Sequence, residues 1–423
     1  MRTLQLAALA ALLASFGSPT RAQEARPQEK PTGLLEARKG FTTKLARQVR
    51  DDDELEAPPA ALFEVVRYKG PLGEMKAVLG KPPAGAKGRL PAILWVTGGF
   101  PPGGCGSSAW SAPDLDNEQS AQAYRHAGLI MMYPTFRGSF GNPGHQESFL
   151  GEVDDLLAAA SYLAKVPYVD PERIYLGGHS TGGTLALLAA MAGGPFKAVI
   201  SFGPVGDPVG YGDEVLTFDP KVELEARVRA PIHYLAALRV PTYVIEGDRR
   251  GNVESLRALK AGSKNPLLRC FEVRGATHFD LLAALNAVIA KKLAAPGELK
   301  LEQEELQRAY DEDRAAAREA YDLSTLAQLR RRGLSLDRPC LARHHCLARE
   351  QAPLTKLAAA AAKLGLRASE VAKHVDREGD PYYLVVLSKE LTLQDLPQLF
   401  ATTASIERLA KEADALYDGW TVD

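Results

Sequence analysis

Short apolar segments alternate with helix-like segments between about residues 61 and 295. The apolar segments lie at 61–68, 75–80, 90–97, 129–134, 173–178, 197–203, 241–247 and 268–275. Between most of them lie stretches with a helical repeat, at 116–126, 150–164, 181–192, 253–261 and 279–293. This alternation predicts an α/β domain with a mostly parallel, eight-stranded sheet and helices on both faces. Functional loops of such sheets lie at the carboxyl ends of the strands.

The pattern changes after Pro296-Gly297. Residues 298–333 are charged with a helical repeat, and the later segments read strand, helix, strand, strand, helix and strand, at 340–347, 352–364, 366–373, 381–388, 396–414 and 416–422. That order predicts a small α+β, ferredoxin-like domain of the split βαβ kind. A chain of 423 residues exceeds the usual size of one core, so we expect two domains, at 61–296 and 297–423.

The first 22 residues have the features of an export signal. Arg2 gives a weakly positive start, Leu4 to Phe16 form a short apolar block, and Thr20-Arg21-Ala22 ends in small residues that a signal peptidase accepts. No run of the chain reaches the roughly eighteen apolar residues of a membrane-spanning helix. We expect an exported protein, periplasmic or secreted. Residues 23–60 have no sustained repeat, which predicts a tether with at most one short helix.

Composition limits the classes of partner. The formal net charge is −1, so charge gives no reason to expect a nucleic acid or an acidic membrane surface. The four cysteines are too few for a disulfide scaffold, and their spacing does not resemble a zinc site. Cys340 and Cys346 could form a disulfide only if the chain turns between them, because on one strand they would stand about 20 Å apart. Free cysteines are the simpler expectation.

The segment Gly178-His179-Ser180-Thr181-Gly182 fits the pattern G-x-S-x-G and stands between a strand-like and a helix-like segment. A strand that turns directly into a helix forces its central residue into a strained, left-handed conformation. Glycines two positions away on either side then remove side chains that would collide. A plain glycine-rich turn is the alternative, but the context favours a turn that presents the Ser180 hydroxyl above the sheet as a nucleophile.

Such a serine needs a base, and the base needs an acid, in the chain order serine, acid, histidine. His278 lies just past segment 268–275, whereas His233 is expected to pack in a cap segment. For the acid, PTYVIEGDRRGNV offers Asp248, which follows a glycine where strand gives way to loop. Glu246 is the alternative, although it would lie on the opposite face if the strand continues. We expect Asp248.

The oxyanion formed during attack needs preorganised N–H donors. Thr181, after the nucleophile, offers one, and the loop WVTGGFPPGG offers Gly98 and Gly99. We expect Gly99 to be the second donor, because glycine lets a backbone approach a ligand closely.

Segment 204–239 stands between two predicted strands and is expected to form a cap. Phe100, Tyr211 and Phe218 are the candidate substrate-binding residues. Within the cap, Tyr211, Phe218 and Tyr234 are expected to shape the acyl pocket, and a place in the core of the cap is the alternative for each of them.

Together these motifs resemble the α/β-hydrolase superfamily, in its prolyl-oligopeptidase (peptidase S9) and dienelactone-hydrolase-like branch. The resemblance rests on YPTFRGSFGNPG, ESFLGEVDDLLAAASYLAKVPYVDPERIYLGGHSTGGTLALL, APIHYLAALRVPTYVIEGD and GATHFD, in order between about 61 and 295. It implies the α/β-hydrolase fold and neither a metal nor an organic cofactor. It also implies a triad of Ser180, Asp248 and His278, with oxyanion contacts from Gly99 and Thr181.

Two features depart from that family. Residues 23–60 are too few for the β-propeller that precedes the catalytic domain in its oligopeptidases, and EGDRRGNV differs from the usual G-x-x-D around the acid.

The segments LRRRGLSLDRPCLARHHCLA, LAAAAAKLGLRASEV and LYDGWTVD resemble the regulator-of-ribonuclease-activity-B domain over about 305–423. In its own family this small domain inhibits ribonuclease E, so the resemblance implies its fold and a protein-binding role. His344 and His345, adjacent on a predicted strand, point to opposite faces and are not expected to share a metal.

Two hypotheses follow. The first is an exported serine hydrolase that cleaves an ester or a short peptide through an acyl-enzyme on Ser180. The second is an inactive hydrolase scaffold that acts as a binding module through its C-terminal domain. The expected partners are a small ester or peptide substrate and a protein at the C-terminal domain, with no nucleic acid and no membrane span.

Overall fold

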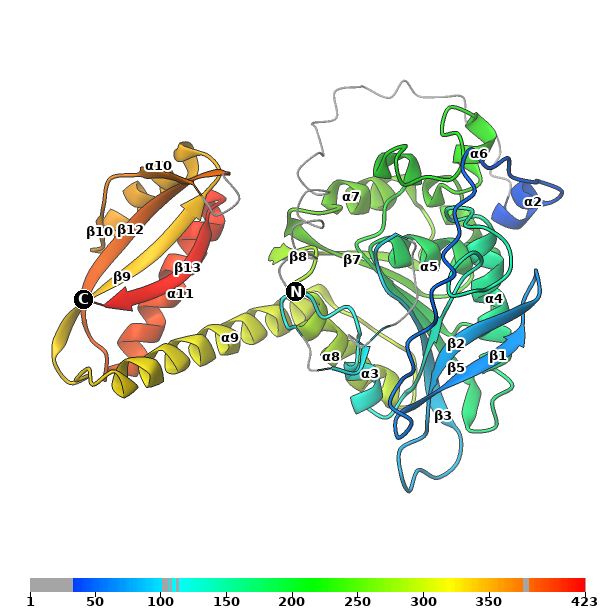
Figure 1. Ribbon diagram of the computed structural model, residues 1–423, viewed down its shortest axis with the longest axis horizontal. Helices are drawn as coiled ribbons and strands as arrows, with labels where there is room; N and C mark the ends of the chain where they lie inside the picture. Colours follow the sequence, from blue (N-terminus) through cyan, green and yellow to red (C-terminus); the bar gives the residue numbers. More distant parts are fainter. Residues whose placement is uncertain (1–32, 101–105, 107–108, 112–113, 376–379, 423) are drawn as a thin grey trace. The chain divides into compact units, whose positions relative to one another are not determined.

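The structure is a computed structural model that describes residues 33–100, 106, 109–111, 114–375 and 380–422 (Figure 1). The predicted export signal lies outside these residues. The chain divides into two compact units, one up to Tyr310 and one from Asp311 onward. The two units are described in turn.

The first unit contains an eight-stranded sheet with the order β1-β2-β4-β3-β5-β6-β7-β8. Its strands are β1 (Phe63–Lys69), β2 (Glu74–Gly80), β3 (Leu90–Val96), β4 (Ile130–Pro134), β5 (Val169–His179), β6 (Ala198–Phe202), β7 (Thr242–Arg249) and β8 (Leu268–Thr277). The pairs that involve β2 are antiparallel, and the pairs from β4 to β8 are parallel. The predicted mostly parallel sheet is confirmed.

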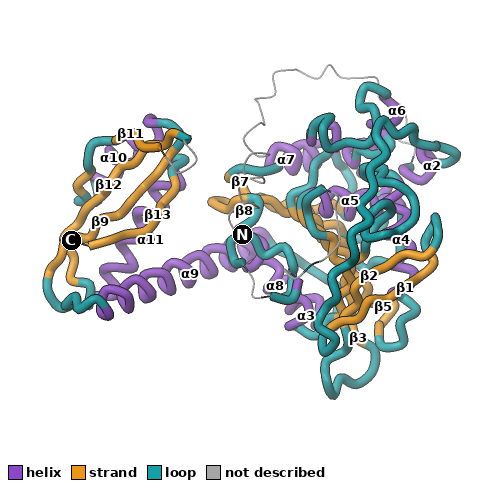
Figure 2. Tube along the Cα trace, viewed as in Figure 1, coloured by secondary structure: helices purple, strands orange, loops and turns teal. Residues whose placement is uncertain are grey.

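Helices cover both faces of this sheet (Figure 2). They are α3 (Ala123–His126), α4 (Gly151–Leu163), α5 (Thr181–Ala192), α7 (Val253–Gly262) and α8 (Leu282–Ala294). The side chains of β3 alternate between two apolar clusters, with Leu94 beside α4 and α5 and Trp95 beside α3 and α8. All residues of α5 are buried, as expected of a helix that is apolar on every side.

One helix is much shorter than its repeat suggests. Residues 116–126 were expected to be helical, but α3 begins only at Ala123. Ala121 has a φ of 50°, which a helix does not tolerate, and the side chain of Gln119 bonds outside its own segment. Long-range contacts therefore override the local repeat.

The N-terminal segment is attached to the cap rather than loose. Beyond the short helix α2 (Leu34–Arg38), the backbone of Lys44 donates to Glu225 Oε1 at 2.7 Å, and Leu45 forms an isolated bridge with Phe218. The prediction of one short helix is confirmed, whereas the prediction of a tether is wrong for the described residues.

The cap spans 204–239 and contains short helical turns. They are η2 (Pro208–Tyr211), α6 (Glu223–Arg227), η3 (Pro231–His233) and η4 (Leu235–Ala237). Arg229 is fully buried at its base, where it pairs with Glu225 at 2.7 Å and lies 4.1 Å from the ring centre of Phe218. Its Nη2 also donates to Thr43 Oγ1 at 2.8 Å, so the cap and the N-terminal segment share one buried cation.

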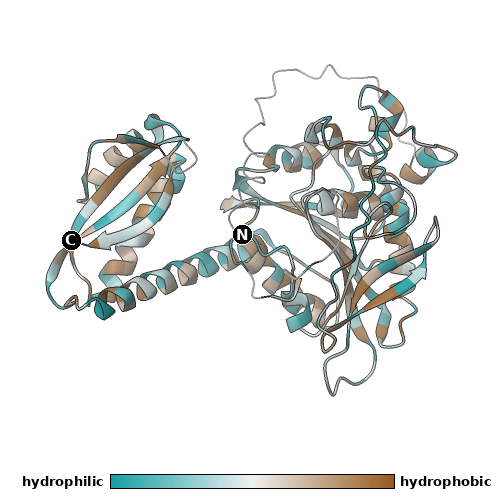
Figure 3. Cartoon of the chain, in the orientation of Figure 1, coloured by the Kyte–Doolittle hydropathy of each residue, from teal (hydrophilic) through white to brown (hydrophobic). Residues whose placement is uncertain are grey.

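The boundary between the units lies later than predicted. Leu299, Leu301, Leu306 and Tyr310 are buried in the apolar cluster of the first unit. The division therefore falls after Tyr310, within helix α9 (Gln303–Arg331), and not after residue 296. Pro296-Gly297 is a turn inside the first unit. Figure 3 shows α9 largely in hydrophilic and intermediate colours, in agreement with its charged sequence.

The second unit has the predicted ferredoxin-like arrangement, with the strand order β10-β12-β9-β13 and antiparallel pairs. Its elements are β9 (Pro339–Ala348), α10 (Gln351–Ala362), β10 (Arg367–Ala368), β11 (Ala372–Val375), β12 (Pro381–Thr392), α11 (Leu396–Ala413) and β13 (Leu416–Val422). The single strand expected at 366–373 is two short strands, and both pair with β12.

Buried polar groups hold this second unit together. Asp322 accepts from Trp420 Nε1 at 2.8 Å and from Thr403 Oγ1 at 2.7 Å, so it joins α9, α11 and β13. His344 is buried and bonds to Tyr417 at 2.9 Å, whereas His345 bonds to Thr421 on the other face. The two histidines therefore diverge as predicted.

Two further expectations concern cysteines and membranes. Cys340 and Cys346 lie on the same strand, and both are free, as the spacing indicates. Within the described ranges, no helix is both long and apolar enough to cross a membrane.

Candidate active site

The turn between β5 and α5 has the strained geometry that the sequence predicts. Ser180 stands between the two elements with φ 55° and ψ −118°. A Cβ at Gly178 would lie 2.5 Å from the carbonyl oxygen of Gly182, and a Cβ at Gly182 would lie 2.2 Å from that of Val96. Only glycine fits at both positions, so the two glycines allow the serine to occupy its strained position.

The histidine and the acid meet at the end of the neighbouring strands. His278 Nδ1 lies 2.7 Å from Glu246 Oε2, and both side chains are almost fully buried. Glu246 also accepts from the backbone N–H groups of Gly247 at 2.8 Å and Asn252 at 3.1 Å. The carboxylate is thus fixed by three donors, and it orients the imidazole with its Nε2 edge free of Glu246.

The expectation of Asp248 as the partner of His278 is wrong. Asp248 Oδ1 accepts from the backbone of Gly275 at 2.7 Å and lies 3.6 Å from Arg249, away from the imidazole. The pairing of β7 with β8 shifts between Gly247 and Arg249, so Asp248 turns toward the edge of β8. Glu246, the alternative, is the buried carboxylate that reaches the histidine.

Space for the His278–Glu246 pair comes from glycines. A Cβ at Gly203, just after β6, would lie 2.4 Å from His278 Cε1 and 2.6 Å from Glu246 Oε2. A Cβ at Gly251 would lie 2.8 Å from His278 Cβ. Gly203 directly follows β6, and Gly251 lies in the loop after β7. These two glycines are therefore the sequence signal that could have shown which strand ends surround His278.

Ser180 and His278 converge over the end of β6. The backbone N–H of Ser180 donates to Phe202 O at 2.8 Å, and the next residue, Gly203, lies against the His278 ring. The Ser180 hydroxyl and His278 form no hydrogen bond among the described residues. Catalytic hydrogen bonds are often long or poorly aligned without substrate, so the lack of a hydrogen bond between Ser180 and His278 is compatible with proton transfer in a substrate complex.

Tyr211 of the cap reaches the same place. Its hydroxyl lies 3.2 Å from Thr184 Oγ1 on α5. Burial raises the pKa of Tyr211 far above its ordinary value; contact with the Thr184 hydroxyl opposes the rise, the charge of Glu246 adds to it, and the Ser180 hydroxyl opposes it. The tyrosine thus stays neutral beside the nucleophile.

The two expected oxyanion donors are adjacent to this serine. Thr181 is the first residue of α5, where backbone N–H groups have no partner within the helix. Its hydroxyl donates to Gly99 O at 2.7 Å and so ties the glycine loop to the nucleophile turn. Gly98 N is occupied by Gln119 Oε1 at 3.1 Å, which leaves Gly99, with a φ of 107°, as the better donor of the pair.

An aromatic cluster lies beside the nucleophile. Tyr211 packs edge to face on Phe100 at 5.1 Å and stacks on Phe149 at 5.8 Å between ring centres. Phe149 was not predicted. Its φ of 74° is rare for a bulky residue, and the preceding Ser148 is also left-handed, at 47°. Strain of this kind is typical of functional sites.

Two predicted pocket residues belong elsewhere. Phe218 is 2% exposed and packs under Arg229, and Tyr234 is buried in the core of the cap. Both therefore stabilise the cap and offer no surface to a substrate.

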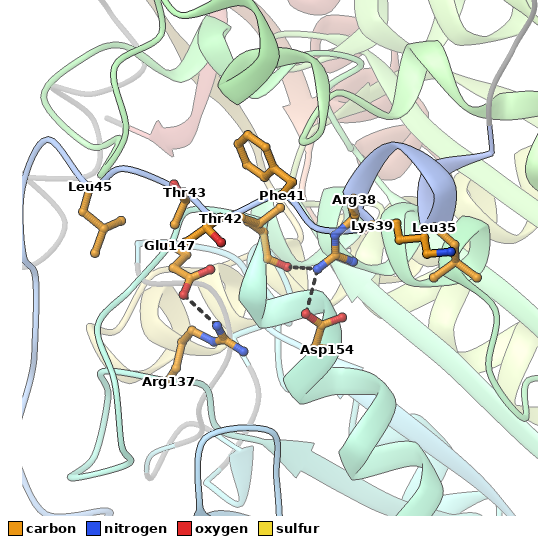
Figure 4. Close-up of a pocket in the computed structure, with 11 residues that line it drawn as sticks. Leu35, Arg38, Lys39, Phe41, Thr42, Thr43, Leu45, Arg137, Glu147 and Asp154 are labelled. Atoms are coloured by element: carbon orange, nitrogen blue, oxygen red, sulfur yellow. Dashed lines mark hydrogen bonds and ion pairs between the residues drawn. The ribbon is translucent and has the colours of Figure 1, made fainter.

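A separate cavity of about 530 Å³ lies between the N-terminal segment and the start of α4 (Figure 4). Its wall includes Arg38, which pairs with Asp154 at 2.9 Å, and Arg137, which pairs with Glu147 at 2.7 Å. The residues that line this cavity do not include Ser180, His278 or Glu246. We therefore place the chemistry at Ser180 and not in this cavity.

Buried carboxylates surround Arg137 beneath that cavity. Asp155 accepts from Arg137 Nε and Nη2 at 2.9 Å each. The adjacent Glu152 is fully enclosed, and burial raises its pKa to about 7. Among the described residues, no cluster of three or more His, Cys, Asp or Glu side chains could hold a metal ion.

Two family models match the chain. The model for the prolyl oligopeptidase family, peptidase S9, matches residues 116–259, and the model for regulator of ribonuclease activity B matches residues 319–422. Among curated proteins, the uncharacterized peptidase YtmA of Bacillus subtilis (strain 168) is 28% identical over 145 residues, which is 30% of this chain and 54% of the relative. The chain thus matches about half the length of that relative.

Solved structures with similar folds have low sequence identity. An acylaminoacyl peptidase of Pyrococcus horikoshii is 18% identical with a TM-score of 0.45, over 58% of this chain and 44% of that chain. A 2,6-dihydroxy-pseudo-oxynicotine hydrolase is 17% identical with a TM-score of 0.42, over 55% of this chain and 67% of that chain. The fold assignment depends on the strand order and the family matches instead. By these criteria the first unit has the α/β-hydrolase fold and resembles the prolyl oligopeptidase family, which indicates a serine hydrolase or peptidase, and the second unit resembles regulator of ribonuclease activity B.

Proposed function

We propose that the protein is an exported serine hydrolase that cleaves short peptides or esters with an apolar acyl group, using Ser180, His278 and Glu246 as its triad. The observation that supports this most is the buried 2.7 Å contact between His278 and Glu246, at the strand end that also anchors the strained Ser180. Export is part of the proposal through the sequence of residues 1–22.

The reaction proceeds in two steps. His278 Nε2 accepts the Ser180 proton as Oγ attacks the substrate carbonyl, and Glu246 stabilises the imidazolium. The backbone N–H groups of Gly99 and Thr181 bind the oxyanion. His278 then donates its proton to the leaving group, and an acyl-enzyme remains. Water activated by the same imidazole releases the acid.

The substrate class follows from the surroundings of the serine. Phe100 and Tyr211 are partly exposed and form an apolar wall that suits an apolar acyl group, and the buried ring of Phe149 packs behind both of them. Tyr211 belongs to the cap and lies beside the nucleophile turn, 3.2 Å from Thr184 Oγ1, which supports a short substrate that fits beneath the cap. The similarity to an uncharacterized peptidase of Bacillus subtilis favours peptides over esters.

The test is covalent labelling with a fluorophosphonate probe. We expect the wild type to be labelled and Ser180→Ala to be unlabelled, and we expect hydrolysis of p-nitrophenyl butyrate and of short apolar peptide p-nitroanilides by the wild type alone. A wild type without Ser180-dependent labelling would instead favour the second hypothesis, a binding module that acts through the C-terminal domain. The family match at 319–422 supports a protein partner for that domain in either case.

A further inference from the structure

A second histidine lies directly behind the proposed base. His179, next to Ser180 in the chain, is completely buried. Its Nε2 lies 2.9 Å from the backbone carbonyl oxygen of His278, and the two ring centres are 4.5 Å apart. His179 thus contacts the main chain of the base, while Glu246 contacts its ring.

The other side of His179 faces Gln119. Nδ1 of His179 lies 3.1 Å from Gln119 Oε1, which also accepts from Gly98 N at 3.1 Å. Gln119 Nε2 donates to Asn117 Oδ1 at 3.0 Å, which fixes the orientation of the amide. One side-chain oxygen therefore accepts from the glycine loop and packs against the ring of His179.

The Gly98–Gly99 loop also packs closely against Ser180. A Cβ at Gly98 would lie 2.9 Å from Gln119 Oε1 and 3.0 Å from Ser180 Cβ. Displacement of Gln119 would therefore move the loop that offers Gly99, and displacement of His179 would move the loop that carries His278.

The protonation of His179 follows from its partners. A carbonyl oxygen only accepts, so Nε2 of His179 must carry a proton and donate it to His278 O. Burial lowers the pKa of His179 well below its ordinary value, and the adjacent His278 lowers it further. The neutral ring then has no proton on Nδ1, so its 3.1 Å approach to Gln119 Oε1 is a packing contact and not a hydrogen bond. A neutral His179 also adds no like charge beside His278 when the latter becomes an imidazolium.

We infer that His179 and Gln119 are positioning residues of the proposed hydrolase, which fix the backbone of His278 and the Gly98–Gly99 loop relative to Ser180. The inference rests on the proposed function. Neither side chain is assigned a contact with substrate. Displacements of about 1 Å in such an arrangement cost up to about 100-fold in rate, so small shifts at either residue are expected to be visible in kcat.

The test compares variants that keep or remove the key donor and acceptor. His179→Gln keeps an N–H that can reach His278 O, and His179→Phe removes it. Gln119→Glu keeps the acceptor for Gly98 N, and Gln119→Leu removes it. The control is Tyr124→Phe, which removes a buried hydrogen bond to Asn286 Oδ1 between α3 and α8, in the apolar cluster around Trp95.

We expect His179→Phe and Gln119→Leu to lower kcat by about 10- to 100-fold with KM changed less than about twofold, and the conservative variants to restore most of it. The double variant should cost less than the product of the two single losses, because the two side chains pack on each other at 3.1 Å and displacement of one disturbs the other. Tyr124→Phe should lower Tm and leave kcat unchanged.

Two results would overturn the inference. The first is a kcat of His179→Phe and Gln119→Leu equal to that of the wild type, with only Tm reduced, as for Tyr124→Phe. The second is an equal loss in the conservative variants, which would show that shape and not hydrogen bonding matters. If the wild type itself lacks Ser180-dependent turnover, the proposed function fails first, and that result is recognisable before any variant is compared.

Discussion

The assignment of the triad acid can be tested by a pair of substitutions two positions apart. Glu246→Gln removes the charge of the buried carboxylate, and Asp248→Asn does the same at the neighbouring candidate. Each change keeps the size of the side chain. The comparison therefore isolates the charge beside His278.

The contacts of Glu246 determine what its amide replacement can do. Oε1 accepts one backbone N–H, and Oε2 accepts one backbone N–H and the His278 Nδ1 proton. An amide NH2 in the Oε1 position opposes one donor, and in the Oε2 position it opposes two. The amide oxygen therefore stays toward His278, and the loss is mainly that of the charge that stabilises the imidazolium.

We expect Glu246→Gln to lower kcat by about 1,000-fold, which corresponds to roughly 4 kcal/mol of transition-state stabilisation. Asp248→Asn should change kcat by less than about threefold, because Asn Oδ1 can still accept from Gly275 N, and because Asp248 does not touch the imidazole. The assay is the initial rate of p-nitrophenyl butyrate hydrolysis at saturating substrate, with Ser180→Ala as background.

The opposite ranking would refute the reasoning. If Asp248→Asn loses as much as Glu246→Gln, or if Glu246→Gln keeps more than about a tenth of the rate, the buried contact at 2.7 Å is not the catalytic one. Fluorophosphonate labelling of each variant confirms that Ser180 remains accessible.

Three other predictions concern the surroundings of the site. Gly203→Ala should abolish turnover, because its Cβ would lie 2.4 Å from His278 Cε1, whereas the matched control Gly206→Ala meets nothing closer than 3.6 Å and should remain active in the same rate assay. Phe149→Ala removes the buried ring on which Phe100 and Tyr211 pack, so it should displace that wall and raise KM for apolar acyl groups by about tenfold, with little change for acetyl esters, as steady-state kinetics would show. Equal effects on both substrates would contradict the proposed wall. Burial raises the pKa of Glu152 from 4.5 to about 7, so its contribution to stability is present below about pH 4.5 and is lost as the pH rises through 7. In urea unfolding, Glu152→Gln should therefore have a free energy of unfolding up to about 3 kcal/mol higher than that of the wild type at pH 8, and an equal one at pH 4.5.

Much of the architecture could be predicted because it depends on local patterns. Each strand of the first sheet is a short apolar run, and the fully apolar segment 181–192 could only be a buried helix. The Ser180 turn was also predictable, since its glycines are two positions away in the chain. The βαββαβ order of the C-terminal unit likewise followed from element types alone.

Other features depend on contacts between distant residues. Gln119 lies in a segment with a helical repeat, yet its side chain accepts from Gly98 and packs against His179, 21 and 60 positions away along the chain. The N-terminal segment looks like a tether because its own sequence has no repeat, but its partners are Glu225 and Phe218 in the cap. Periodicity contains no information about such partners.

The choice between Asp248 and Glu246 could not be made from the G-x-x-D pattern, because it depends on the space around His278. In the pattern G-x-x-D, counted from Gly247, the acid position is occupied by Arg250 in this chain. Asp248 is the nearest aspartate in sequence, but the register shift of β7 turns it away. Glu246 comes from the strand itself and has a longer side chain, and it reaches His278 only because position 203 has no Cβ. In this chain the carboxylate beside His278 therefore comes from a position four residues before the aspartate of the G-x-x-D pattern, and the glycine at the end of the neighbouring strand provides the space that this position requires.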